Sequence, residues 1–337
     1  MSELASAARQ ATADAVTTTD GPIAPRGTRN GPGAGAGKPV YVESHIAAPV
    51  ETVWDRTQDP ALHQRWDVRF TSIDYLPGTD GDPQQFRYAT TVAPGLPVSG
   101  RGETIGERHR PDGTAYSALE FWSDHPLSLI RRGSGFWRYV PTDDGVRFLT
   151  RFDYTVRWGI AGRILDRLFR PLFGWGTAWS FDRLRLWIEH GVTPERSRNQ
   201  ALAHAIAVVG LAFVWMYHGL VPKIVAPDAG ELELFTNAVG FVDHPRGALG
   251  AIGFAQIAFG ATVLVRWRRR WPYLVTLAAM PPLTLGALAG DSSAFVRPFN
   301  PVTLNVAMIA LAAIALLTRD GLPSARNTLR VPPAGDR

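Results

Sequence analysis

The sequence predicts an α+β soluble domain, in which a sheet grips a long helix, followed by an all-α four-helix transmembrane bundle. Two observations carry this prediction. Residues 39–190 alternate polar and apolar positions as a soluble domain does, whereas the charged residues after Arg198 fall between long apolar segments. The mean hydropathy of −0.05 averages these two halves and describes neither of them.

Residues 1–38 are mostly small and polar, with almost no large apolar side chain. Such a segment cannot bury enough apolar surface to offset the entropy of ordering, so we expect a disordered tail. It also lacks the apolar stretch of a secretory signal, and we therefore expect that nothing exports the domain that follows.

The soluble domain is predicted over residues 39–191. A strand starts at Val40, and a helix follows Pro49 with apolar residues at helical spacing. The domain closes with a long helical pattern that Pro171 and Gly174 to Gly176 interrupt. Between these helices lie six further β runs, separated by turn-forming segments, at about 70–76, 85–92, 100–109, 115–123, 130–140 and 146–158.

The stretch HIAAPVETVWDRTQDPALHQRWD resembles the opening of the START-like (SRPBCC) superfamily, which includes polyketide cyclase/dehydrase and Bet v 1-like proteins. There a first strand ends in I-x-A-P-x-E-x-V-W and a short helix ends near W-D. The resemblance covers about 39–190. It implies a helix-grip fold, with a curved antiparallel sheet and a C-terminal helix that enclose an apolar cavity for lipids, sterols, polyketides or other hydrophobic ligands. Some members are enzymes, whereas many only bind or carry a ligand.

Two-residue steps along the predicted strands place pairs of side chains on shared faces. If these faces point inward, they line an aromatic cavity in which Glu120 and Arg138 pair with each other or orient the polar end of a ligand. The alternative is an outward, solvated pair, because a register slip of one residue reverses the assignment. The ligand-cavity candidates are Trp66, Tyr88, Glu120, Trp122, Phe136, Arg138, Phe152 and Tyr154.

Arg163, Arg167 and Arg170 recur at helical spacing on the last helix of this domain, which also has an apolar side. This pattern suits a basic helix on anionic membrane lipid, so these arginines are the membrane-surface candidates. The alternative is a solvated arginine stripe on a helix whose apolar face plugs the sheet. In either case the short linker at 192–198 keeps the domain close to the bilayer.

Four windows without Asp, Glu, Lys or Arg follow the linker, each long enough to cross a hydrocarbon core. Arginines precede the first window, lie in the loop between the second and third windows, and follow the fourth window. After the fourth window we expect a disordered basic tail at 321–337. By the positive-inside rule, the soluble domain and both termini are cytoplasmic in a multi-pass inner-membrane protein. Within a membrane domain at 199–320, the spans lie at about 199–222, 247–265, 271–290 and 298–318.

The segment FVWMYHGLVPKIVAP resembles the end of span one in DoxX-like membrane proteins, where a W-x-x-x-G-L-V-P-K pattern is common. The resemblance covers 199–320 and implies a four-helix module; some relatives belong to thiosulfate- or quinone-linked redox systems. His218 with Lys223 suggests a site for an anionic headgroup or a quinone carbonyl, and the alternative is an interfacial role. The residues of this membrane-domain motif are Trp215, His218, Gly219, Pro222 and Lys223.

The composition limits the chemistry. With no cysteine, disulfides, thiolate metal sites and thiol nucleophiles are excluded. No histidine pair has metal-ligand spacing, so we predict no bound metal. We also predict no cofactor, and the alternative is a bound quinone. The net charge of +5 comes from arginines beside apolar segments, which favours lipid headgroups over nucleic acid as the partner.

These features favour membrane-tethered binding or transfer of a hydrophobic ligand of lipid, polyketide or prenyl type. Two alternatives stay open. One is a cyclase or dehydratase that acts on an apolar substrate, with Glu120 or Tyr154 as acid or base. The other is an accessory subunit of a quinone-linked membrane redox complex. No catalytic motif stands out, and the catalytic residues and protein partners are unknown.

Overall fold

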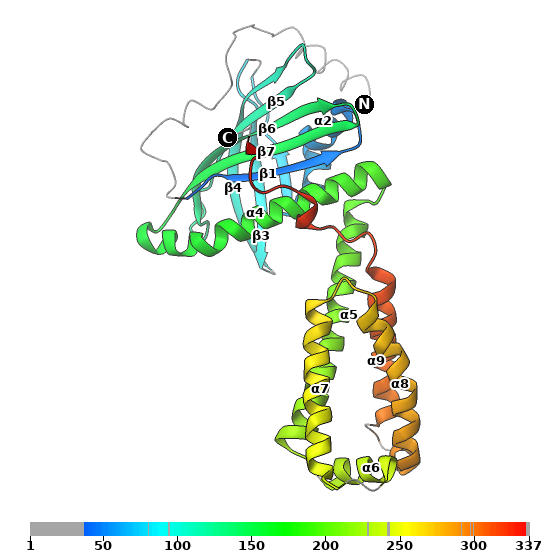
Figure 1. Cartoon of the computed structure of the whole chain (residues 1–337). Helices are drawn as coiled ribbons and strands as arrows, with labels where there is room; N and C mark the ends of the chain where they lie inside the picture. The colour runs from blue at the N-terminus through cyan, green and yellow to red at the C-terminus, as the bar shows by residue number, and fades with distance from the viewer. Residues whose placement is uncertain are drawn as a thin grey trace.

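The computed structural model describes residues 37–79, 81–93, 95–227, 229–240, 243–290, 292–296, 298 and 300–334. The disordered tail predicted at 1–38 lies, except for its last two residues, outside this part of the chain. Figure 1 shows a curved sheet above the long helix α4, with the helical bundle extending from the opposite side of α4. The N-terminal domain consists of β1 (Val40–Ile46), α2 (Val50–Gln58), α3 (Pro60–Trp66), β2 (Ser72–Tyr75), β3 (Gln85–Ala93), β4 (Leu96–His109), β5 (Ala115–Trp122), β6 (Ile130–Thr142), β7 (Gly145–Val156) and α4 (Gly159–His190).

The seven strands form one antiparallel sheet in the order β1-β7-β6-β5-β4-β3-β2. Strands β2 to β7 follow one another as a meander, and β1 joins the sheet beside the last strand. The helices α2 and α3 occupy the long connection from β1 to β2. Asp59 separates these two helices, and its carboxylate accepts hydrogen bonds from the amides of Ala61 and Leu62 at 2.8 and 3.3 Å, which caps α3.

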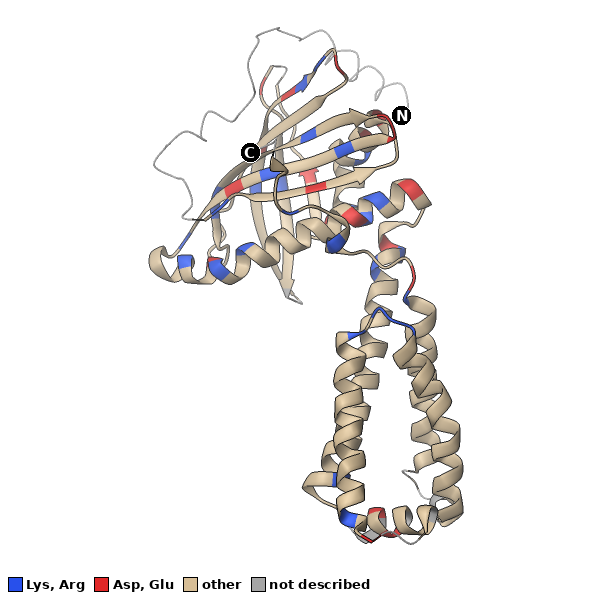
Figure 2. Cartoon of the chain, in the orientation of Figure 1, with Lys and Arg blue, Asp and Glu red and all other residues tan. Residues whose placement is uncertain are grey.

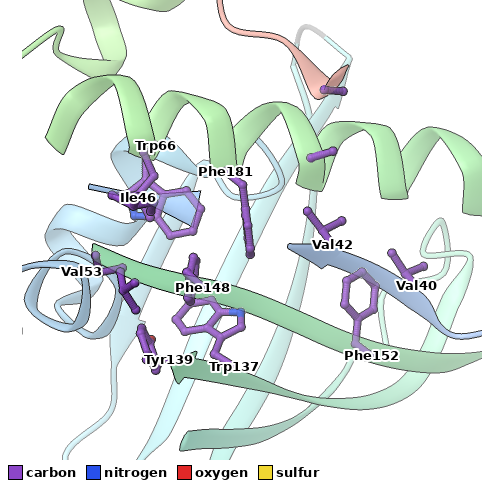
Figure 3. Packing of buried hydrophobic residues seen from close by; sticks show 14 of the residues in the cluster. Val40, Val42, Ile46, Val53, Trp66, Trp137, Tyr139, Phe148, Phe152 and Phe181 are labelled. Atoms are coloured by element: carbon purple, nitrogen blue, oxygen red, sulfur yellow. The ribbon is translucent and has the colours of Figure 1, made fainter. Parts of the chain in front are cut away.

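The core lies between α4 and the concave face of β1, β6 and β7 (Figure 3). Trp66, Tyr139, Phe148 and Phe181 are fully buried there. The rings of Phe148 and Phe181 stack with centroids 4.5 Å apart, which joins the middle of the sheet to α4. These packed aromatic rings exclude solvent from this half of the domain.

The predicted interruption of the last helix is wrong, because α4 is one continuous helix of 32 residues. Pro171 lies on the exposed side of α4, where water can bond the carbonyl that the missing proline amide leaves free. Gly174 is buried and faces Val40, so it lets α4 approach β1. The helix ends at Gly191, whose φ of 65° forms a left-handed C-cap.

The four predicted spans are confirmed as helices long and apolar enough to cross a membrane. Figure 2 shows basic residues in the loop between α7 and α8, at the end of the bundle nearest the soluble domain. The loop charges had predicted that this loop and the soluble domain share one side. The bundle consists of α5 (Pro194–Leu220) with its π-helical extension η1 (Val221–Val225), α6 (Ala229–Val239), α7 (Pro245–Val265), α8 (Trp271–Gly290), η2 (Ser292–Val296) and α9 (Pro301–Thr318).

The predicted linker at 192–198 is helical from Pro194 onward, because Pro194 begins α5. Buried Arg183 of α4 donates to the Pro194 carbonyl at 2.9 Å. Arg65 of α3 donates twice to the Glu195 carboxylate, at 2.8 and 3.0 Å. The soluble domain therefore meets the first span through fixed polar contacts.

The prediction of a disordered basic tail at 321–337 is wrong for residues 321–334. After α9 the chain returns to the soluble domain, forms the short helix η3 (Ala325–Asn327) and pairs Leu329 with Glu43 of β1. The buried carboxylate of Asp182 in α4 accepts a hydrogen bond from the Ser324 amide at 2.7 Å. Residues 321–334 are called the C-terminal segment below.

Candidate functional site

The concave face over β3, β4 and β5 differs from the closed core, because its aromatic side chains are only half-buried. Phe86 and Tyr88 of β3 lie over Gly102 and Gly100 of β4. A Cβ atom at either glycine would lie 2.3 Å from the ring, so only glycine lets these rings approach β4. The half-buried ring of Phe121 lies over Gly133 of β6 in the same way. Together these rings form an accessible apolar surface, the aromatic surface below.

Four of the predicted cavity residues point into the domain. Trp66, Phe152 and Tyr154 are buried, and Tyr88 is half-buried within the aromatic surface. Burial raises the pKa of Tyr88 to about 12. The Tyr154 hydroxyl donates to the Asp166 carboxylate at 2.7 Å, and burial together with this bond raises its pKa above the ordinary range. Tyr154 is thus a protonated hydrogen-bond donor.

The other four predicted cavity residues lie on the convex face, and their assignment to a cavity is wrong. On β6 the inward positions are Trp137 and Tyr139. Strand alternation therefore turns Phe136 and Arg138 outward. The structure agrees with the outward alternative for Glu120 and Arg138, although Glu120 pairs with Arg132, whose Nη2 donates to its carboxylate at 2.8 Å. The outward residues are Glu120, Trp122, Phe136 and Arg138.

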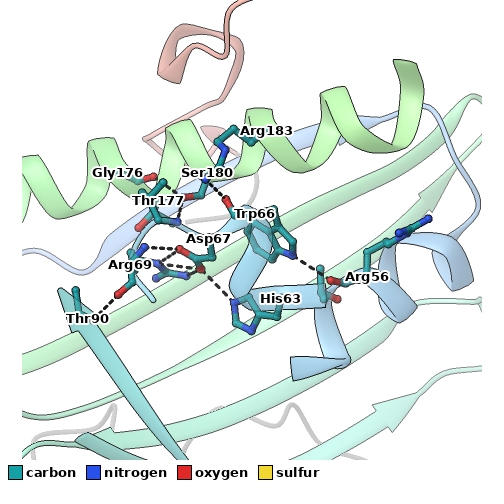
Figure 4. Close-up of polar contacts among 12 residues, drawn as sticks. Arg56, His63, Trp66, Asp67, Arg69, Thr90, Gly176, Thr177, Ser180 and Arg183 are labelled. Atoms are coloured by element: carbon teal, nitrogen blue, oxygen red, sulfur yellow. Dashed lines mark hydrogen bonds and ion pairs between the residues drawn. The ribbon is translucent and has the colours of Figure 1, made fainter. Parts of the chain in front are cut away.

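A charged cluster lies where α3 ends, beneath α4 (Figure 4). The buried carboxylate of Asp67 accepts from Arg69 Nε at 2.9 Å and from Arg69 Nη2 at 2.6 Å. The Nε2 atom of His63 lies 3.1 Å from Asp67 Oδ2, the oxygen that also accepts from Arg69 Nη2. The Arg69 guanidinium also lies 5.5–5.7 Å from the centroids of three aromatic rings on the inner side of the domain.

The ionisation of this cluster follows from its contacts. Burial alone raises the pKa of Asp67, but the Arg69 charge and the bonds from His63 and Arg69 outweigh it and hold the pKa below its ordinary value. Burial lowers the pKa of His63, and Asp67 offsets this only in part. The cluster therefore holds an ion pair and a neutral imidazole at neutral pH. The W-D motif contained Asp67, but the sequence did not show that Arg69 folds back onto it.

The prediction that Arg170 is a membrane-surface residue is wrong. It donates from Nε to Asp166 at 2.8 Å and from Nη1 to Asp153 at 2.7 Å, on the side of α4 that faces the sheet. Arg163 and Arg167 are exposed, as a membrane-surface role requires. A groove of about 670 Å³ lies between this part of α4 and the start of β1, and all three arginines line it.

The membrane-domain motif makes helix contacts. A Cβ atom on Gly219 would lie 2.4 Å from the Gly253 carbonyl, so α5 and α7 touch through their backbones. The Trp215 Nε1 donates to Thr276 of α8 at 3.2 Å. Lys223 pairs with Glu231 of α6, so its ammonium already has a partner. The other motif residues, His218 and Pro222, are half-buried at the same end of α5.

His204, near the other end of α5, is fully buried. Its ring nitrogens lie 3.1 Å from the Thr318 hydroxyl and 3.0 Å from the Trp267 carbonyl, which ties α5 to both neighbouring segments. Within the described ranges, no group of three or more His, Cys, Asp or Glu side chains could hold a metal ion. The quinone site stays a prediction.

Both family resemblances are confirmed by comparison with known families. Residues 39–185 match the family described as polyketide cyclase / dehydrase and lipid transport, and residues 212–313 match the DoxX-like family. The chain is 46% identical over 296 residues to the uncharacterized membrane protein YndG of Bacillus subtilis (strain 168), covering 87% of this chain and 97% of that protein.

Solved structures resemble the N-terminal part. A STAR-related lipid transfer protein from Xanthomonas axonopodis is 21% identical, with 44% of this chain and 85% of that chain covered and a TM-score of 0.36. The Zhui aromatase/cyclase from Streptomyces sp. R1128 is 16% identical, with coverages of 46% and 97% and a TM-score of 0.34. Human StAR-related lipid transfer protein 5 is 19% identical, with coverages of 45% and 75% and a TM-score of 0.35.

Proposed function

The chain belongs to the family of the Bacillus subtilis membrane protein YndG, and from that premise we propose that its soluble domain binds a hydrophobic ligand exchanged with the bilayer. The ligand is of lipid, polyketide or prenyl type. The observation that carries the proposal is the aromatic surface, which stays accessible while the neighbouring half of the domain is closed. An apolar ligand would cover these rings and gain the free energy of removing them from water.

The first half of α4 supports a place at the bilayer surface. Its side away from the sheet is a continuous stripe of exposed apolar residues, with 71% of Ile160 and 77% of Leu168 accessible. Such a stripe beside basic residues is typical of helices that lie in a membrane interface. The same stripe includes Ile160, Ile164, Leu165, Leu168, Leu172 and Trp175.

The position of α4 in the chain also favours this placement. The bundle extends from the side of α4 opposite the sheet (Figure 1), which is the side of the apolar stripe. Only residues 194–200, roughly 10 Å of helix, separate the start of α5 from its first apolar segment. The exposed Arg163 and Arg167 would meet anionic lipid there, and the positive-inside rule favours the cytoplasmic leaflet.

The test uses the full chain purified in a mild detergent, with the bound lipid extracted and identified by mass spectrometry. Leu119 lies half-buried on the inward side of β5, between Ser117 and Phe121, so the larger ring of Leu119→Trp would cover part of the aromatic surface. We expect this variant to lose one apolar compound that the unmodified chain carries. The bundle is unchanged in the variant, so lipid bound by the spans cancels in the comparison.

The matched control is Leu127→Trp, because Leu127 is exposed in the connection between β5 and β6. It should keep the full ligand load. If the two variants and the unmodified chain carry the same compounds in the same amounts, the proposal is wrong.

A further inference from the structure

The groove between the first half of α4 and β1 is separate from the aromatic surface and has about 670 Å³ of free space. Four parts of the chain form its walls: α4, residues 37–41, the end of β7, and Arg330 of the C-terminal segment. Asp182 holds that segment through the Ser324 amide, so the groove is complete only while the segment is docked.

The charges along this groove are unbalanced. Five basic side chains line it, but only one carboxylate, that of Asp166, which already accepts two hydrogen bonds from neighbouring side chains. Arg163, Arg167 and Arg330 have no hydrogen bond or ion pair from their guanidinium groups within the part of the chain that the structure describes. Three unpaired guanidinium groups around one space favour an anion with several acceptor oxygens.

Apolar side chains line the same groove. Ile160 and Ile164 border it, and both also belong to the exposed stripe of α4. Val40 and Val156 extend the apolar wall from the sheet. A small hydrated anion makes no use of such a wall. A phosphate group attached to acyl chains matches both halves of the lining, because its oxygens meet the arginines while its chains stay with the apolar stripe.

We infer that this groove binds the phosphate headgroup of an anionic phospholipid in the leaflet that faces the soluble domain. The inference rests on the proposed placement of α4 at the bilayer and is independent of which ligand covers the aromatic surface. Phosphate free in solution offers the same oxygens, so the experiment separates the two sources.

The experiment titrates the delipidated full chain in detergent with phosphatidic acid or phosphatidylcholine in mixed micelles, and counts bound lipid by native mass spectrometry. The test variant is R163Q/R167Q. The control is R87Q/R101Q, which removes the same charge from two exposed arginines that face each other across β3 and β4. All four side chains are exposed, and unchanged melting temperatures establish that both variants fold.

We expect phosphatidic acid to bind R163Q/R167Q at least tenfold more weakly than the unmodified chain, with the control within twofold and phosphatidylcholine unaffected. Equal losses in both variants, or no loss in either, would overturn the inference. Inorganic phosphate or glycerol 3-phosphate that binds as tightly as phosphatidic acid would overturn the lipid source.

The apolar compounds carried by the same samples separate this result from the proposed function. R163Q/R167Q should retain the ligand that Leu119→Trp loses. If Leu119→Trp loses nothing while R163Q/R167Q loses phosphatidic acid binding, the groove stands and the aromatic-surface proposal fails.

Discussion

Asp67→Asn tests how far the charged cluster beneath α4 stabilises the soluble domain. The substitution keeps the shape of the side chain and removes its charge. Asp67 is the ion-pair partner of Arg69, whose side chain is only 10% exposed. The guanidinium would be left among aromatic rings without a counter-charge, which costs far more than the loss of a solvated pair.

The expected cost is about 3 kcal/mol, the lower end of the range for breaking a buried ion pair, because the asparagine oxygen still accepts one hydrogen bond. A domain of this size loses about 2 kcal/mol of stability per molar urea, so the unfolding midpoint should fall by about 1.5 M. The matched control is Glu120→Gln, which breaks an ion pair whose Arg132 side chain is 62% exposed, and there we expect less than about 1 kcal/mol.

The effect should depend on pH with a definite sign. The pKa of Asp67 is lowered in the folded domain from its ordinary value of 3.8. Its contribution to stability is therefore complete above the ordinary pKa and disappears as the pH falls through the folded pKa. The difference between the unmodified chain and Asp67→Asn should be constant near neutral pH and should shrink below about pH 4.

The assay is a urea titration of the full chain in a mild detergent, followed by near-ultraviolet circular dichroism, because Trp66 and Trp137 lie close to the cluster. An unchanged slope with a lower midpoint identifies a stability effect. A shift for Asp67→Asn no larger than that for Glu120→Gln would refute the reasoning.

Three further predictions concern the C-terminal segment, the packing of α5 on α7, and the apolar stripe of α4. Asp182→Ala removes the acceptor of the Ser324 amide, so the C-terminal segment should become sensitive to limited proteolysis while the four spans stay intact. Gly253→Leu should abolish the packing of α5 on α7, since any Cβ there lies 2.6 Å from the Gly219 carbonyl, and should lower the melting temperature in detergent. Leu168→Glu places a charge in the apolar stripe and should reduce quenching of tryptophan fluorescence by brominated lipid, with no change expected if α4 lies away from the bilayer.

The membrane half followed from the sequence because its signal is local. A run of about 20 apolar residues has few alternatives to a spanning helix, and the arginine loops added which ends lie together. The order of strands and helices in the soluble domain was similarly accessible, since turn-forming residues separate its strands. Both family resemblances rested on such short local motifs.

The candidate site was only half predictable, because strand alternation fixes which residues share a face but not which face is inward. On β7 the inward choice of Phe152 and Tyr154 was correct, whereas on β6 the same reasoning chose Phe136 and Arg138, one residue away from the buried positions. The register against the neighbouring strands and the cover from α4 decided this.

The sequence by itself determined a soluble α+β domain, four spans and their family membership, since each depends on composition and spacing within one stretch of chain. Only the tertiary structure decided that Arg69 neutralises Asp67, that Arg170 turns inward, and that the C-terminal segment returns to Asp182. The last of these contacts joins residues 142 positions apart. Such partners are chosen by the folded geometry of charge and burial, which no local pattern records.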